Sequence, residues 1–95
     1  MRVCALVSDL MDRSKIIAAI PDAVFMLDGT ADVVVVDISK SAQLVAEIRA
    51  EMPAARIVCF GPHVDDDAAD AAQAAGADVV MARSRFFRDP AAAIR

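Results

Sequence analysis

The sequence is poor in the residue types that mark several common classes of protein. Its 95 residues include no Trp, no Tyr, one His, two Cys and three Gly. Cys4 and Cys59 lie in separate apolar runs, without the spacing of a CxxC motif or of a Cys/His zinc site. We therefore expect two inert, buried thiols, and neither a zinc centre nor a redox pair.

Long apolar runs and an excess of basic side chains are missing as well. Hydrophobic residues make up 58% of the chain, but no run approaches the roughly 20 apolar residues of a membrane span. The formal net charge is -4, which does not suit binding to a phosphate backbone. Since no signal-peptide pattern is present, we expect a cytoplasmic protein. From the net charge and the short apolar runs, we expect it to bind neither nucleic acid nor a membrane.

What the sequence does contain is a series of short apolar runs that alternate with helical patterns. The runs predict five strands, at residues 3–7, 23–27, 33–36, 57–60 and 79–81. The patterns between and after them predict helices at residues 13–20 with Asp12 as the N-cap, at 41–52, at 68–75 after the acidic triplet 65–67, and at 90–94. This alternation predicts one α/β domain over residues 1–95, built on a parallel sheet.

The link between the second and third predicted strands is unusually short. Residues 28–32 are all that connect them, whereas a parallel crossover usually takes a dozen or more residues. Asp28-Gly29 is also a strong signal for a type I′ hairpin turn, which would make this edge antiparallel. We favour a shortened parallel crossover, because the run at 23–27 already follows a helix.

Acidic side chains follow two of the predicted strands at the point where each strand ends. The valine run 33–36 ends in Asp37, and the first apolar run is followed by Ser8 and Asp9. Ligands of open α/β sheets bind just beyond the carboxyl ends of the strands. The sequence therefore predicts that Asp9 and Asp37 lie in one shared crevice.

In this order the residues resemble the receiver domain of bacterial two-component response regulators. The resemblance covers nearly the whole chain, through Ser8-Asp9, Asp37, residues 57–65 and residues 76–84. It implies a flavodoxin-like, three-layer sandwich with a five-stranded parallel sheet of order 2-1-3-4-5, helices on both faces, and a second helix that is reduced or absent. It also implies that Asp37 stands at the phosphoacceptor position and that Asp9 and Asp37 are candidate ligands of Mg²⁺.

Three positions depart from the pattern of that family. Ser8 replaces a carboxylate of the acidic pair, Gly61 replaces the switch Ser/Thr, and Arg83 replaces a lysine. Losing a carboxylate lowers affinity for Mg²⁺, and the planar guanidinium is not equivalent to an ammonium group. The predicted site is thus depleted, and its lining residues are Ser8, Asp9, Gly61, His63 and Arg83. Each also has a structural interpretation: the carboxylates cap helices or pair with Arg83, and His63 is a solvated loop residue.

Two adjacent aromatic residues near the C-terminus are flanked by arginines. Arg85, Phe86, Phe87 and Arg88 are candidates for an exposed interface. Alternatively, one of the two phenylalanines fills the core while the arginines stay in solvent.

Two functions remain open from the sequence. The first is a degenerate receiver-like signalling module without catalytic turnover or cofactor, which acts by binding a signalling protein, a histidine kinase or a second copy of itself as a homodimer. The second is a working Mg²⁺-dependent phosphoacceptor, phosphorylated on Asp37 in a two-component phosphorelay. An enzyme is disfavoured, because the sequence has neither a Gly-rich phosphate loop nor a Ser/His/Asp arrangement.

Overall fold

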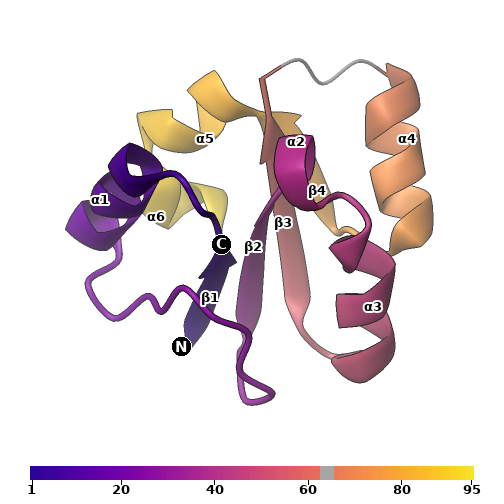
Figure 1. The fold of residues 1–95 in the computed structure, drawn as a ribbon, viewed down its shortest axis with the longest axis horizontal. Coiled ribbons are helices and arrows are strands. Elements are labelled where there is room, and N and C mark those ends of the chain that lie inside the picture. Colours follow the sequence, from indigo (N-terminus) through magenta and orange to yellow (C-terminus); the bar gives the residue numbers. More distant parts are fainter. Residues whose placement is uncertain (63–65) are drawn as a thin grey trace.

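A four-stranded parallel sheet forms the centre of the computed structural model, which describes residues 1–62 and 66–95 (Figure 1). Neighbouring strands follow the order β1-β2-β3-β4. The strands are β1 Val3–Leu6, β2 Val33–Asp37, β3 Arg56–Gly61 and β4 Val79–Ala82. The helices are α1 Leu10–Ala19, α2 Ile38–Ser41, α3 Leu44–Glu51, α4 Asp66–Ala75, α5 Arg83–Arg88 and α6 Pro90–Ala93.

Helices cover both faces of the sheet, which confirms the predicted α/β arrangement. Successive strand side chains point to opposite faces, so Val33 and Val35 join one apolar core while Val34 and Val36 join the other. The first core is closed by α1, α5 and α6, and the second by α3 and α4 (Figure 1). All five residues of β2 are buried, which explains its unbroken run of valines.

The strand predicted at residues 23–27 is not formed, so the sheet has four strands of order β1-β2-β3-β4 in place of five of order 2-1-3-4-5. Of residues 23–27, only Val24 pairs with the sheet, through an isolated parallel bridge to Cys4 on the outer side of β1. Its N–H donates to the Val3 carbonyl at 3.0 Å, and its own carbonyl accepts from the Ala5 N–H at 2.8 Å. Phe25 then packs against the core, while Met26 is 71% exposed. The link to β2 is short, so the chain must leave the edge of β1 soon after Val24 in order to reach the start of β2.

The hairpin alternative is also wrong, since the bridge at Val24 is parallel. Asp28 instead organises a turn that needs no antiparallel partner. One of its carboxylate oxygens accepts from the Thr30 N–H at 2.8 Å and from the Thr30 hydroxyl at 2.7 Å, and the other accepts from Arg2 Nε at 2.8 Å. No helix forms between residue 20 and β2, as expected for a reduced second helix.

We expect the turn at Asp28 to make folding sensitive to acid. The hydroxyl and N–H of Thr30, and then Arg2, lower the pKa of Asp28 to about 2, from about 3.9 in an unfolded chain. The stabilisation is therefore complete above pH 4 and is lost as the pH falls through about 2. Urea unfolding of the protein and of Asp28→Asn should show a stability difference at pH 5 that shrinks towards pH 2. A difference that stays constant with pH would contradict this origin.

Two predicted helices begin elsewhere than expected. Asp9, and not Asp12, is the N-cap of α1, so the helix starts three residues earlier. The predicted helix 41–52 is replaced by α2 and α3, and α2 begins directly after Asp37. In both places a carboxylate that follows a strand accepts a hydrogen bond from a backbone N–H, and a helix begins at the next residue. The helix expected at 68–75 is found in α4, where Asp66 and Asp67 occupy the first turn.

Arg49 of α3 ties together the connections at the opposite end of the sheet. Its guanidinium donates to the carbonyls of Gly76 and Ala55 and pairs with Asp78 at 2.7 Å. Gly76 has φ +124°, and a Cβ there would lie 2.7 Å from Cβ of Arg49. Glycine is therefore required at this position by both backbone conformation and close packing.

Both cysteines are buried and unpaired, as predicted. Burial, with a smaller contribution from the charge of Asp78, raises the pKa of the Cys59 thiol to about 12. In residues 1–62 and 66–95, no helix combines the length and apolar character needed to cross a membrane.

Candidate functional site

The carboxyl ends of the strands bring most of the predicted site residues to one edge of the sheet. In the register of the sheet, Asp37 pairs with Phe60 and Gly61 with Ala82, while Leu6 of β1 lies opposite Val36. The chain continues from β1 into Ser8 and Asp9, and from β4 directly into Arg83.

Asp37 is buried where β2 ends, with a relative exposure of 4%. Its Oδ1 accepts from the Ser39 N–H at 3.0 Å and from the Ser39 hydroxyl at 2.6 Å. The carboxylate therefore acts as the N-cap of α2. One of its two oxygens is engaged within its own segment of the chain.

Asp9 caps the neighbouring helix in the same way but lies in solvent. Its Oδ1 accepts from the Asp12 N–H at 3.0 Å. This hydrogen bond is the main reason why the pKa of Asp9 lies below its ordinary value, with smaller contributions from the Met11 N–H and from the charges of Lys40 and Arg83. Asp9 is thus held ionised at the edge of the site.

Asp12, which the sequence suggested only as an N-cap, is a further residue of the site and lies in the first turn of α1. It is 2% exposed and forms a two-pronged ion pair with Arg83. Arg83 Nη1 donates to Asp12 Oδ2 at 2.9 Å, and Nη2 donates to Asp12 Oδ1. The signal was present in the sequence, because Asp12 precedes the buried Ile16 by four residues and so shares its inward face.

Arg83 places a fixed positive charge among three carboxylates. Its hydrogen bonds to Asp12 raise the pKa of the guanidinium, and the charges of Asp12, Asp37 and Asp9 raise it further. The guanidinium carbon also lies 4.9 Å from the ring centre of Phe87 and 5.8 Å from that of Phe60. These contacts fix the position of the guanidinium from two sides. We refer to Asp9, Asp12, Asp37 and Arg83 as the strand-end cluster.

The other predicted lining residues contribute less. Ser8 is exposed, and Gly61 is a buried residue at the end of β3 that brings no hydroxyl to the edge. His63 lies outside the described residues.

Many of the carboxylate oxygens of the strand-end cluster are engaged within the chain itself. Within the described part of the chain, no three His, Cys, Asp or Glu side chains lie close enough together to hold a metal ion. Both oxygens of Asp12 bind Arg83, and Asp9 and Asp37 each use one oxygen to cap a helix. Mg²⁺ prefers a near-octahedral shell of oxygen ligands. Asp9 and Asp37 as metal ligands therefore remain a prediction for experiment to test.

Helix α5 buries one residue of the candidate C-terminal interface and exposes others. Phe86 is fully buried, so it cannot belong to an exposed contact surface. Its ring stacks on Phe60 with ring centres 4.8 Å apart. Phe87 is half-buried, and Arg85 and Arg88 are exposed. The helical turn explains the division, because adjacent residues point in different directions around its axis.

Comparison with known proteins identifies the fold. No family model matches the sequence, and neither does any curated protein sequence. Among solved structures, a response regulator from Burkholderia pseudomallei, with a phosphorylated aspartic acid, a calcium ion and citrate, is similar with a TM-score of 0.80 at 16% identity; 99% of this chain matches 66% of that one. An orphan response regulator of H. pylori gives a TM-score of 0.76 at 16% identity, with 100% and 97% covered.

A response regulator from Hahella chejuensis is also similar, with a TM-score of 0.73, 21% identity and coverage of 88% and 80%. Identities this low establish the fold and leave the chemistry to be argued from the site. The chain has the fold of a response-regulator receiver domain, as the sequence motifs predicted.

Proposed function

We propose that this chain is a degenerate receiver-like signalling module of the cytoplasm, which acts by binding another protein and carries out no catalytic turnover. The observation that carries the proposal is the ion pair of Arg83 with both oxygens of the buried Asp12. The guanidinium supplies, from within the chain, positive charge that a receiver site otherwise takes from a metal ion and a lysine. Mg²⁺ must therefore compete with the guanidinium of Arg83 for the carboxylates of the site.

Two further features support a site without a phosphoryl switch. The Oδ1 atom of Asp37 is engaged with Ser39, and Gly61 has no hydroxyl with which to follow a phosphoryl oxygen. Signalling by this chain then depends on its surface. The partner is a signalling protein, a histidine kinase or a second copy of the chain, and Arg85, Phe87 and Arg88 are the proposed contact residues.

The alternative is a phosphoacceptor at Asp37, and one observation favours it. Asp37 ends β2, an interior strand, at the edge of the sheet where α/β proteins bind ligands. In this alternative, Mg²⁺ at Asp9 and Asp37 assists phosphorylation in a two-component phosphorelay, and the added charge acts on Gly61 and Arg83.

Titration with Mg²⁺ and beryllofluoride, followed by backbone amide NMR, separates the two. We expect no saturable shifts at Asp37, Gly61 or Arg83 in the natural sequence. The double variant Ser8→Asp/Arg83→Lys, which restores a second carboxylate and a lysine, should bind Mg²⁺ more tightly and serves as the matched control. Saturable shifts around Asp37 in the natural sequence would overturn the proposal and establish the phosphoacceptor.

A further inference from the structure

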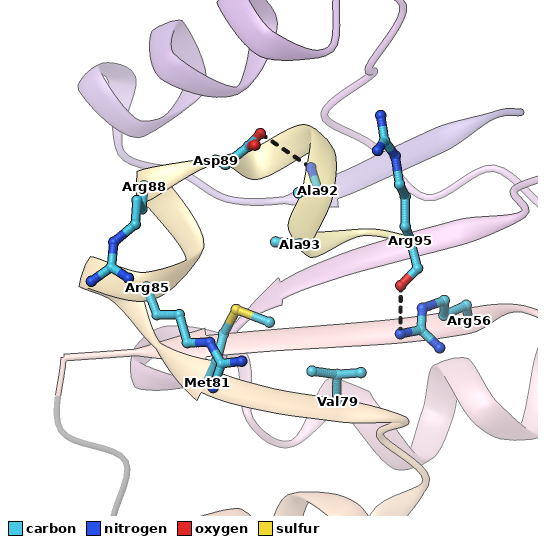
Figure 2. Close-up of a pocket in the computed structure, with 9 residues that line it drawn as sticks. All are labelled: Arg56, Val79, Met81, Arg85, Arg88, Asp89, Ala92, Ala93 and Arg95. Atoms are coloured by element: carbon cyan, nitrogen blue, oxygen red, sulfur yellow. Dashed lines mark hydrogen bonds between the residues drawn. The ribbon is translucent and has the colours of Figure 1, made fainter.

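A pocket on the outer strand of the sheet contains none of the residues of the strand-end cluster. Its volume is about 360 Å³. Figure 2 shows its apolar part, Val79 and Met81 of β4, with α5 and α6 on one side and Arg56 of β3 on another. Four arginines line it: Arg56, Arg85, Arg88 and Arg95. We call this the arginine pocket.

The charge of the arginine pocket is not balanced by carboxylates. Arg2, Arg49 and Arg83 each pair with an aspartate, but within residues 1–62 and 66–95 no ion pair joins any of the four arginines of the pocket to a side-chain carboxylate. Its single lining carboxylate, Asp89, caps α6 by accepting from the Ala92 N–H at 3.2 Å. Figure 2 shows the guanidinium of Arg95 turned away from the pocket, so the positive potential here comes from Arg56, Arg85 and Arg88, on a chain whose net charge is -4.

Arg56 provides a second, independent indication of a ligand. Its Nη2 donates to the main-chain oxygen of Arg95 at 2.9 Å, but its buried Nε has no hydrogen-bond partner among residues 1–62 and 66–95. Buried donors are nearly always satisfied, and leaving one unpaired is costly. A shift of the Arg56 side chain on binding would let an anion in the pocket supply the missing acceptor.

We propose that the arginine pocket binds a small organic diphosphate, of the class of the nucleoside diphosphates. Guanidinium groups match phosphate oxygens in two-pronged pairs. The pocket volume of about 360 Å³ is near the lower end of the range for ligand pockets, so it suits a compact ligand. The cations around it favour a ligand with several negative charges, which a diphosphate provides. The half-buried Val79 and Met81 give the organic part of the ligand an apolar surface to pack against.

Calorimetric titration of the full chain with ADP, pyrophosphate and adenosine tests each part of this proposal. ADP should bind saturably, pyrophosphate more weakly because it lacks the apolar part, and adenosine not measurably. Amide NMR shifts should concentrate in residues 79–95. Equal affinity for ADP and pyrophosphate would overturn the role of the apolar surface, and no saturable binding of either would overturn the site.

Exposed arginines allow the test without disturbing the core. Arg85→Gln/Arg88→Gln should weaken ADP binding about tenfold or more, because it removes two of the charged donors to the phosphate groups. Arg2→Gln, which removes one of the same charges outside the pocket, is the matched control and should bind ADP as the natural sequence does. A similar loss in both variants would indicate nonspecific attraction and overturn the site. Circular dichroism on each variant confirms that the fold is intact.

Discussion

Replacing Arg83 with alanine is expected to lower the free energy of unfolding by about 3 kcal/mol. The substitution leaves the carboxylate of Asp12 buried without a partner, and an unpaired buried charge is among the most costly defects in a protein. It also removes the guanidinium from the rings of Phe87 and Phe60. For a domain of this size the loss is a large part of the total stability of roughly 5–15 kcal/mol.

Removing the other partner of this ion pair, Asp12, should lower the free energy of unfolding much less. Asp12→Ala removes the buried charge and leaves Arg83, whose side chain is 37% exposed, free to turn towards water, Asp9 and Asp37. We expect a loss of about 1 kcal/mol, partly because alanine is favourable within a helix. The measurement is urea unfolding of both single variants and the double variant. If Asp12→Ala costs as much as Arg83→Ala, the buried carboxylate is not the dominant energetic feature of the site.

Phe86→Ala is expected to be the most destabilising substitution in the C-terminal segment, at about 4 kcal/mol. The ring of Phe86 is 0% exposed, stacks on Phe60, and meets Phe87 edge to face with ring centres 4.9 Å apart. Its removal leaves a cavity between α5 and the sheet and loses these aromatic contacts as well.

Phe87→Ala is the matched control, because it removes the same group from the next position. Phe87 is half-buried, so we expect a loss of about 1–2 kcal/mol. Thermal unfolding followed by circular dichroism distinguishes the two variants. Equal losses would mean that burial does not separate the roles of the two rings. A stable Phe87→Ala variant also makes it possible to test this residue in partner binding without loss of the fold.

The strands and their direction could largely be predicted from the sequence. Runs of β-branched residues identify buried strands locally, and their alternation with helical segments implies parallel neighbours. The positions of Asp9 and Asp37 follow from the same pattern, since Asp37 comes directly after an apolar run and Asp9 is separated from another by Ser8 alone. The apolar run 23–27 was misleading because its composition is that of a strand, whereas the short link at 28–32 decides how long it can stay at the sheet edge.

By itself, the sequence determined that this chain is a small α/β protein with acids at the ends of parallel strands, because those features depend on neighbours within a few residues. The tertiary structure decided which side chains pair in the site and which residues line the same pocket. Asp12 and Arg83 are 71 residues apart in the chain, and Arg56 and Arg85 reach the same pocket from different elements. Such encounters depend on strand order and on how helices pack across the sheet, and no local pattern of residues encodes them.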